Sequence, residues 1–272
     1  LPNALTLANA GCGLLAIAKA IDALAYKDFF AQRMENACWL IFLAMIFDAL
    51  DGKVARLMQS FSDFGAELDS FADAITFGVA PAIMAKVLLE HHDVLHPKLH
   101  FLAATAFALM AILRLARFNL ETEHEAEAHT HFRGLPSPAA AAAVTTTILM
   151  VLSLEGGIEV VDGQPTVVGK GLGLVPEGMR HGAVLVLLPV LATLLPLLGI
   201  LMVSRVRYPH LGAYLFRRRA RFVQLVLLVF AGLLLTAAPV PLLFVAALGY
   251  VAWGLAGSRA HRTQEVALPE EP

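Results

Sequence analysis

Long apolar runs separated by short polar connections divide this chain into segments of helix length. A helix needs about 20 predominantly apolar residues to cross the hydrocarbon core of a bilayer. No stretch alternates with the two-residue period of a barrel strand, so we expect helices as the spanning elements. Eight segments qualify, the seventh being short: residues 4–26, 36–58, 67–90, 99–120, 135–155, 183–204, 222–237 and 240–257. The pattern predicts an all-α, polytopic membrane helical bundle of about eight transmembrane helices.

Composition agrees with this prediction. Of the 272 residues, 58% are hydrophobic and only 15% are charged, whereas a soluble domain is roughly half apolar and a quarter charged. The net charge of −2 by itself indicates no class of partner; the composition favours membrane lipids, and we expect no nucleic-acid partner. Cys12 and Cys38 both stand in apolar stretches, so we interpret them as buried thiols and not as a disulfide or metal framework.

Lysine and arginine predict the orientation of the spans. With an even number of spans both termini lie on one side, which then holds thirteen Lys and Arg residues against five in the opposite loops. Cytoplasmic connections carry the excess of positive charge. We therefore expect both termini in the cytoplasm.

Four aspartates stand in two pairs where the second predicted span ends and the third begins. Asp48 precedes Asp51 by three residues, and Asp69 precedes Asp73 by four. Both spacings place the two side chains on one face of a helix. The intervening sequence SFSDFG is typical of a turn. Two adjacent, antiparallel helix ends would then present four carboxylates to one space.

This group of carboxylates indicates a cation site. A charged side chain inside a span costs about 2.5–3.5 kcal/mol on the insertion scale, and clustered carboxylates repel one another unless a positive charge lies between them. Oxygen ligands without Cys or His favour a hard cation such as Mg²⁺ or Mn²⁺. One or two such ions beside Arg56 would suit a diphosphate. The small residues Gly52, Ala55 and Gly65 would let a ligand or a facing helix approach the backbone closely.

Together these positions resemble the signature of a known family. The pattern Asp-x2-Asp-Gly-x2-Ala-Arg-x8-Gly-x3-Asp-x3-Asp is complete here as Asp48, Asp51, Gly52, Ala55, Arg56, Gly65, Asp69 and Asp73. It is similar to the motif of the CDP-alcohol phosphotransferase family, with no departure at any fixed position. Eight fixed residues over 26 positions make a chance match improbable. The resemblance implies transfer of a phosphatidyl group from a CDP-lipid to a small alcohol.

The resemblance also implies a role for each residue. The metal ligands would be Asp48, Asp51, Asp69 and Asp73. Asp73 would in addition be the general base that takes the proton from the attacking hydroxyl. The nucleotide end of the CDP-lipid would contact Asn3, Thr6, Asp48, Gly52, Ala55 and Arg56. For Asn3 and Thr6, which follow Pro2 in the family's N-terminal Pro-Asn-x-x-Thr segment, a simple cap of the first helix is the alternative.

Three further stretches resemble bacterial and archaeal phosphatidylserine synthases. They are LPNALTLANAGCGLLAI, FGAELDSFADAITFGVAPA, and ARFNLE followed by FRGLPSPAAA. With the motif they cover much of the first 145 residues, and beyond that only hydropathy matches. This resemblance implies CDP-diacylglycerol as the donor and serine as the acceptor.

Serine carries a carboxylate as well as a hydroxyl, and the sequence offers residues to bind it. Arg114, Arg117 and Arg133 are predicted at the cytoplasmic ends of the fourth and fifth spans, beside the inferred metals, and Asn119 adds an amide. A guanidinium can bind a carboxylate or a phosphate through two parallel hydrogen bonds. Which arginine meets serine and which meets the lipid phosphate is left open, and for Arg117 and Arg133 a purely topological role is the alternative.

Three rival functions are compatible with parts of this pattern. Glycerol phosphate or inositol phosphate as acceptor would also favour several arginines. An intramembrane prenyltransferase also binds a diphosphate through aspartates and magnesium, but typically without the Ala-Arg and Gly steps found here. A cation transporter would have acidic residues along a path, whereas these aspartates gather at one predicted membrane edge.

The remaining segments carry less chemistry. His92, His96 and His100 recur at four-residue spacing, but Pro97 interrupts them and we interpret them as part of an external loop rather than a metal site. We expect a solvated connector at 121–131, an irregular external loop at 156–182 and an arginine cluster at 217–221 that contacts anionic headgroups.

The organisation that we expect is a single transmembrane domain over residues 1–272, with a catalytic core at about 1–155 and additional spans at about 183–257. We expect an integral protein of a prokaryotic inner or plasma membrane, with its active site facing the cytoplasm. The family resemblance further implies a homodimer.

Overall fold

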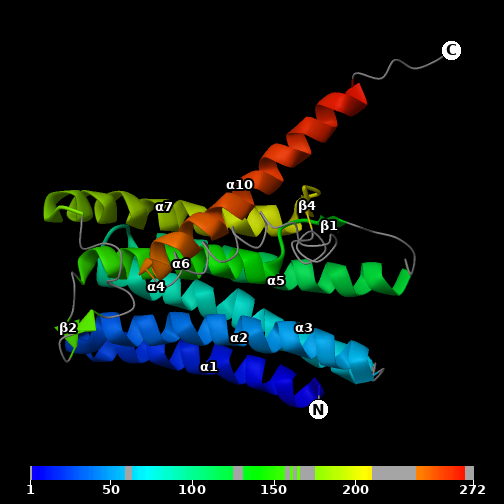
Figure 1. Cartoon of the computed structure of the whole chain (residues 1–272), viewed down its shortest axis with the longest axis horizontal. Helices are drawn as coiled ribbons and strands as arrows, with labels where there is room; N and C mark the ends of the chain where they lie inside the picture. The colour runs from blue at the N-terminus through cyan, green and yellow to red at the C-terminus, as the bar shows by residue number, and fades with distance from the viewer. Residues whose placement is uncertain are drawn as a thin grey trace.

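A computed structural model describes residues 2–58, 63–124, 131–156, 160–161, 164–165, 175–209 and 237–266. Long helices run side by side through this part of the chain, and α10 crosses the others obliquely before extending away from them (Figure 1). The helices are α1 (Pro2–Ala25), η1 (Lys27–Phe29), α2 (Phe30–Met58), α3 (Asp63–Asp73), η2 (Ala74–Val79), α4 (Ala80–His91), α5 (Pro97–His124), α6 (Ser137–Glu155), α7 (Glu177–Val203) and α10 (Pro239–Val266). Four short strands complete the described elements: β1 (His131–Arg133), β2 (Val160–Val161), β3 (Gln164–Pro165) and β4 (Arg207–Pro209).

The predicted all-α membrane bundle is confirmed. Six helices in the described part of the chain are long and apolar enough to cross a membrane: Asn3–Ala25, Phe64–His91, Pro97–Leu120, Ser137–Glu155, Glu177–Val203 and Pro239–Gly257. The predicted span 36–58 is also helical, as α2, but its second half carries the charged residues of the aspartate motif and it is not among the six. The predicted span 222–237 lies almost wholly outside the described residues.

The third span contains a helical irregularity that the hydropathy pattern did not predict. Between α3 and α4 the chain forms the π-helix η2, with Thr76, Phe77 and Gly78 buried. Pro81 follows shortly after and has no N–H to donate to the preceding turn, which disfavours regular α-helical bonding there. Such π turns are frequent at functional sites, and this one begins immediately after Asp73.

Small side chains allow α1 and α2 to pack closely along their length. Ala16, Ala20 and Ala23 of α1 recur at helical spacing and are fully buried, as are Met34 and Ile41 of α2. Small residues at a membrane helix contact let the two backbones approach, so that dispersion contacts hold the pair together. In Figure 1 the two helices lie next to each other at one edge of the bundle.

Both cysteines are buried free thiols, as predicted: Cys12 lies in α1 and Cys38 in α2. Neither takes part in a disulfide or in a metal-binding group among the residues that the structure describes.

The connections differ in part from the prediction. Residues 156–182 were expected to be irregular throughout, but α7 begins at Glu177, and the two-residue strands β2 and β3 pair within the segment. The expected connector 121–131 begins as helix, because α5 continues to His124. The arginine cluster at 217–221 lies outside the described residues.

His92, His96 and His100 form no metal-binding group within the described ranges. His92 Nε2 lies 3.2 Å from a carboxylate oxygen of Glu155, whereas the ring of His100 is buried. Pro97 starts α5, so His92 and His96 lie outside that helix, whereas His100 belongs to it; the interpretation of His100 as part of a loop was wrong.

A short ribbon ties the start of α6 to the end of α7. Strand β1 pairs antiparallel with β4, Phe132 facing Tyr208 in the register. Tyr208 is fully buried, and its ring lies 5.7 Å from that of Tyr250 in α10. Burial, with a smaller contribution from Tyr250, raises the pKa of Tyr208 to about 12. The phenol therefore stays neutral and packs α10 against the bundle.

Gly134 is required where β1 turns into α6. Its φ is +86°, and its N–H donates to the carbonyl of Val206 at 2.8 Å. A Cβ there would overlap the carbonyl oxygen of Met202 and lie 3.2 Å from that of Ser204. Both the backbone conformation and the close approach of α7 therefore select glycine.

We expect Gly134→Ala to lower the free energy of unfolding by about 1–3 kcal/mol, because it forces a left-handed conformation and a clash with α7. Thermal or denaturant unfolding of the purified protein in detergent measures this. Gly249→Ala is the matched control, since a Cβ at that exposed position of α10 meets nothing within 4 Å. Equal stability of the two variants would contradict the role of Gly134.

Candidate functional site

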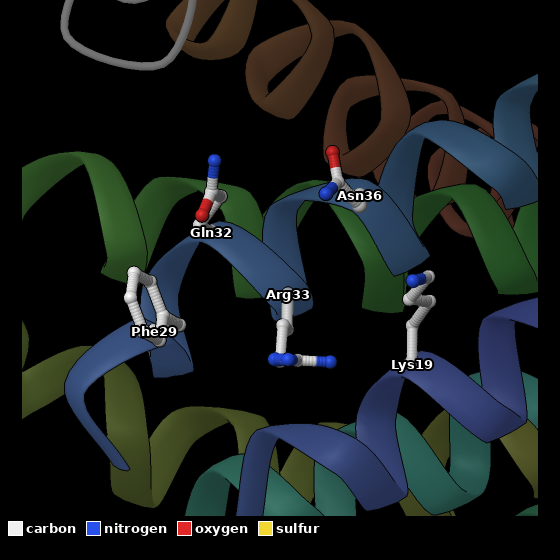
Figure 2. A pocket seen from close by; sticks show the side chains of 5 residues that line it. All are labelled: Lys19, Phe29, Gln32, Arg33 and Asn36. Atoms are coloured by element: carbon white, nitrogen blue, oxygen red, sulfur yellow. The ribbon is translucent and has the colours of Figure 1, made fainter. Parts of the chain in front are cut away.

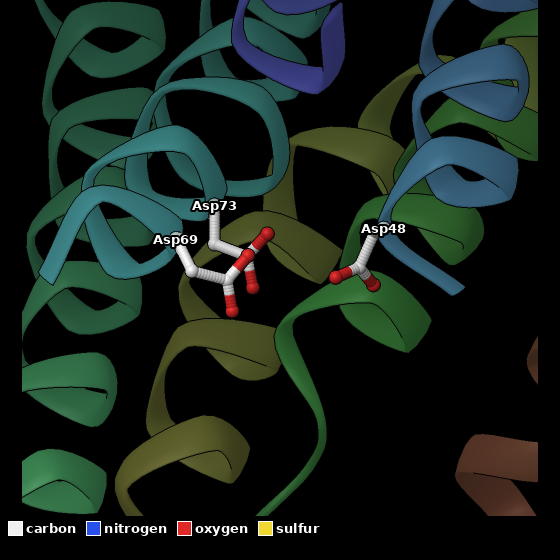
Figure 3. Close-up of side chains that lie close together, drawn as sticks. All are labelled: Asp48, Asp69 and Asp73. Atoms are coloured by element: carbon white, nitrogen blue, oxygen red, sulfur yellow. The ribbon is translucent and has the colours of Figure 1, made fainter. Parts of the chain in front are cut away.

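Three carboxylates converge between α2 and α3. Asp48 projects from α2, and Asp69 and Asp73 project from successive turns of α3 toward it (Figure 3). One oxygen from each of the three lies within 4.8 Å of the others. The predicted convergence of the two helix ends is therefore present for these three side chains.

The donor set fits a divalent cation. The three oxygens are close enough for one ion to bridge them, and they come from ligands that Mg²⁺ and Mn²⁺ prefer. Each carboxylate is only partly exposed, so water screens their mutual repulsion incompletely. A bound cation would remove that repulsion, and this acidic cluster could therefore hold a metal.

Asp51 lies beside this group and has a different partner. It is buried, and its Oδ2 accepts a hydrogen bond from the hydroxyl of Thr6 in α1. Its charge still acts on Asp48 and Asp69. The structure thus places Asp51 next to the three converging carboxylates without making it one of them, and its role as a metal ligand stays a prediction.

A buried amide orients Asp73. Asn9 of α1 is fully buried, and its Nδ2 donates to Oδ1 of Asp73 at 3.1 Å. The backbone carbonyl of Asn9 in turn accepts a hydrogen bond from the hydroxyl of Thr76, in the π turn, at 3.1 Å. A Cβ at Gly13, one turn further along α1, would lie 2.9 Å from Cα of Thr76. Close packing of α1 against η2 therefore fixes the orientation of one oxygen of Asp73.

A second polar contact joins α3 to α5. The hydroxyl of Ser70 lies 2.9 Å from the amide nitrogen and 3.1 Å from the amide oxygen of Asn119. Ser70 is the residue after Asp69, so this contact fixes the helix that carries two of the three carboxylates. The predicted substrate residue Asn119 thus lies against the site through Ser70.

Arg114 lies on the same side of the bundle, in α5. Its Nη1 donates to the hydroxyl of Ser137 at 3.0 Å, and its Nε is buried without a hydrogen-bond partner among the described residues. Its positive charge acts on Asp73 and on Tyr250 of α10. Arg114 therefore brings a partly buried positive charge within electrostatic range of the carboxylates.

The other predicted residues fall at the periphery. Thr6 is buried and donates a hydrogen bond to Asp51, a contact between two helices that a simple helix cap would not make. Asn3 is exposed near the start of α1. Gly52 is exposed, and a Cβ built there meets nothing within 4 Å, so packing within the chain does not require glycine at that position. Arg117 lies on α5 one turn beyond Arg114.

For three predicted residues the structure describes only the backbone. Ala55 and Arg56 belong to α2 and Arg133 to β1, but their side chains lie outside the described part. Their predicted contacts with nucleotide, serine or phosphate stay predictions.

Sequence reasoning missed Asn9, Ser70 and Thr76. A signal for Asn9 was present: it is the one amide inside the apolar run of the first span after Asn3, and it follows Thr6 by three residues, which puts both on one helix face. Ser70 and Thr76 gave no such signal, because a hydroxyl in a span usually bonds to its own helix.

Chemically, this arrangement combines an acidic cluster able to bind a cation, a carboxylate with one oxygen held by an amide, and a guanidinium nearby. These are the parts that a displacement at a phosphorus atom requires: charge neutralisation, a proton acceptor and a cation for an anionic group.

Comparison with known proteins identifies several enzymes whose sequences are similar to this chain. CDP-diacylglycerol–serine O-phosphatidyltransferase of Helicobacter pylori is 29% identical over 211 residues, which span 77% of this chain and 71% of that protein. The enzyme of the same name from Bacillus subtilis is 38% identical over 121 residues, spanning 44% of this chain and 62% of that protein. Archaetidylserine synthase of Methanothermobacter thermautotrophicus is 39% identical over 124 residues, spanning 45% and 48% respectively.

The sequence model of one family, described as CDP-alcohol phosphatidyltransferase, matches residues 1–168. This range contains α1 to α6, and with them the converging aspartates and the amide and guanidinium groups around them. The chain therefore belongs to the CDP-alcohol phosphatidyltransferase family.

Proposed function

We propose that this protein transfers the phosphatidyl group of CDP-diacylglycerol to the hydroxyl of L-serine, giving phosphatidylserine and CMP. Membership of the family supports the reaction type, and relatives that are named serine O-phosphatidyltransferases or archaetidylserine synthase support serine as acceptor. The observation that carries the proposal is the convergence of Asp48, Asp69 and Asp73 from two helices.

The donor would bind with its acyl chains in the bilayer and its diphosphate against the three aspartates. Asp48, Asp69 and Asp73, with Asp51 beside them, would hold one or two Mg²⁺ or Mn²⁺ ions. When bound, such ions neutralise the charge of the diphosphate and of the leaving phosphate. The open space at Gly52 leaves room for the nucleotide end, which would also contact Asn3, Thr6, Ala55 and Arg56.

Asp73 would accept the proton of the serine hydroxyl. Asn9 occupies Oδ1, so Oδ2 is the oxygen left for the proton. As the serine oxygen forms its bond to the phosphorus attached to the lipid, the bond from that phosphorus to the CMP phosphate breaks, and CMP leaves. A carboxylate close to cations is a weak base, so most of the rate enhancement would come from holding the hydroxyl in line with the phosphorus.

Arg114 is our preferred partner for the carboxylate of serine. Its charge reaches Asp73, and its Nε has no hydrogen-bond partner in the described part of the chain. A guanidinium within electrostatic range of the proton acceptor could hold serine by its carboxylate while the hydroxyl points to Asp73. Asn119, Arg117 and Arg133 would complete the serine and lipid-phosphate contacts.

The excess of arginine and lysine on one side of the spans supports a site open to the cytoplasm at a prokaryotic inner or plasma membrane. By resemblance to the family, the working unit would be a homodimer.

The proposal predicts that purified protein with CDP-diacylglycerol and Mg²⁺ or Mn²⁺ releases CMP on addition of serine, and that chelation of the metal stops the reaction. Parallel reactions with glycerol phosphate, inositol phosphate and a prenyl diphosphate should give no comparable turnover. If the protein preferred a phosphorylated alcohol, the proposed type of reaction would stand, but serine would not be the acceptor. Metal flux into liposomes without any CMP release would instead indicate a transporter.

We expect Asp73→Asn to lower turnover by at least about a hundredfold, because the amide cannot take the proton. Binding of CDP-diacylglycerol should change little, since Asn keeps the shape and Asp48 and Asp69 remain. Asp93→Asn is the matched control: it lies in the connection after α4, and its φ of +50° is one that Asn tolerates. Full activity of Asp73→Asn would remove this residue from the proton transfer.

We expect Arg114→Gln to raise the KM for serine about tenfold or more while changing the KM for CDP-diacylglycerol less, because one charge-assisted hydrogen bond to the serine carboxylate is lost. Initial rates at varied concentrations of each substrate measure both constants. Arg117→Gln, one turn away on α5, is the comparison. A selective rise in the serine KM at Arg117 but not at Arg114 would transfer the role to that residue.

A further inference from the structure

A second polar site lies where α1 packs against α2, far along α2 from Asp48. Lys19 of α1, Phe29 of η1, and Gln32, Arg33 and Asn36 of α2 line a pocket of about 320 Å³ (Figure 2). Arg33 and Asp48 are fifteen positions apart on one continuous helix, which corresponds to roughly 22 Å along the axis. The pocket therefore belongs to the end of the α1–α2 pair opposite the catalytic site.

The lining of this pocket has the chemistry of an anion site. It contains two cationic side chains and two amides, and no carboxylate. In Figure 2, Lys19 on α1 and Arg33 on α2 face the space between the two helices, whereas Gln32, next to Arg33 in α2, and Asn36, one turn further on, point to the other side of α2 in this view. Amide and cationic N–H groups on both sides of one opening suit an oxyanion that accepts several hydrogen bonds.

Arg33 is held in position for this role. One N–H of its Nη1 donates to Asp22 at 3.2 Å, and the guanidinium lies 4.5 Å from the centre of the Tyr26 ring. Its Nε is buried and has no hydrogen-bond partner among the described residues. Asp22 neutralises part of the positive charge but lies outside the pocket lining.

Lys19 has no such partner. In the described part of the chain, no hydrogen bond or ion pair joins its ammonium group to another residue, and the same holds for the side chains of Gln32 and Asn36. A lysine near the end of a membrane helix is costly unless it reaches water or an anion. An anion between Lys19 and Arg33 would satisfy both.

Apolar side chains continue from the pocket along the helices. Phe29 at its edge is 56% exposed. Leu15, one turn from Lys19 on α1, is 55% exposed, and Leu43, two turns beyond Asn36 on α2, is 41% exposed. Positions four and seven apart lie on the same helix face. A ligand with an anionic head and a hydrocarbon tail would match both parts of this surface.

We propose that this pocket binds the phosphate of an anionic membrane phospholipid, at the membrane surface opposite the aspartates. Phosphate oxygens accept hydrogen bonds from Lys19 and from the exposed part of the Arg33 guanidinium, Gln32 and Asn36 contact the rest of the headgroup, and an acyl chain lies along Leu15 and Leu43. The site is separate from the substrate site and does not depend on the reaction proposed above.

Native mass spectrometry of the full-length chain in detergent tests this with three probes: phosphatidylglycerol, phosphatidylcholine and inorganic phosphate. The wild type should bind phosphatidylglycerol in preference to phosphatidylcholine. Lys19→Gln should weaken phosphatidylglycerol binding about tenfold, the size expected for one charge-assisted hydrogen bond, whereas Lys19→Arg should retain it. CMP release should be unchanged in both variants.

Lys27→Gln is the matched control, because Lys27 is a cation at the same end of the α1–α2 pair that does not line the pocket. If Lys19→Gln and Lys27→Gln weakened phosphatidylglycerol binding equally, the effect would come from the overall positive charge of this surface, and the proposed site would be overturned. Equal binding of both lipids by the wild type would overturn its selectivity for an anionic headgroup. If inorganic phosphate displaced phosphatidylglycerol from the wild type at millimolar concentration, the pocket would be a site for free phosphate and not for lipid.

Discussion

The repulsion among Asp48, Asp69 and Asp73 is the constraint around which the described bundle is arranged. At separations of 4.8 Å or less, two ionised carboxylates repel by about 3 kcal/mol or more with an effective dielectric near 20. Helices α2 and α3 would separate to relieve this repulsion unless other contacts held them in place. Cation binding relieves it directly, so the arrangement favours a bound metal and, through it, a diphosphate.

Helix α1 supplies much of the restraint. Its buried alanines pack against α2, while Thr6 and Asn9 donate hydrogen bonds to Asp51 and Asp73. One helix therefore contacts both halves of the acidic motif. The π turn after Asp73 contributes from the other side, because Thr76 bonds to the backbone of α1. Oxygens that must point at a reacting phosphorus need this kind of support from residues that never touch substrate.

The pair α1–α2 presents different chemistry at its two ends. At one end Asp48 of α2 meets the two carboxylates of α3, and at the other Lys19 and Arg33 face an open pocket. Meanwhile α10, outside the region that matches the family, brings Tyr250 within electrostatic range of Arg114. Among the described residues, the C-terminal part of the chain thus acts on the guanidinium that lies nearest to the acidic cluster only through the charge interaction between Tyr250 and Arg114.

The amino-acid sequence alone determined the class of fold, most of the helices and the acidic motif, because these depend on local properties. Hydropathy over twenty residues defines a span, and three- and four-residue spacing places two aspartates on one face. Asp48, Asp69 and Asp73 were therefore predicted together and are found together. Spans and motif required no knowledge of which helix packs against which.

Tertiary structure decided the rest, because it depends on contacts between residues far apart in the chain. Only packing of α1 on α2 and η2 turns Asp51 toward Thr6 and gives Asp73 the amide of Asn9, a residue 64 positions away. Only the approach of α5 to α3 pairs Asn119 with Ser70. The π turn and the pocket of Lys19 and Arg33 likewise arise where helices meet. Helical periodicity tells which side chains share a face, whereas the partner of that face is chosen by the shape of the whole bundle.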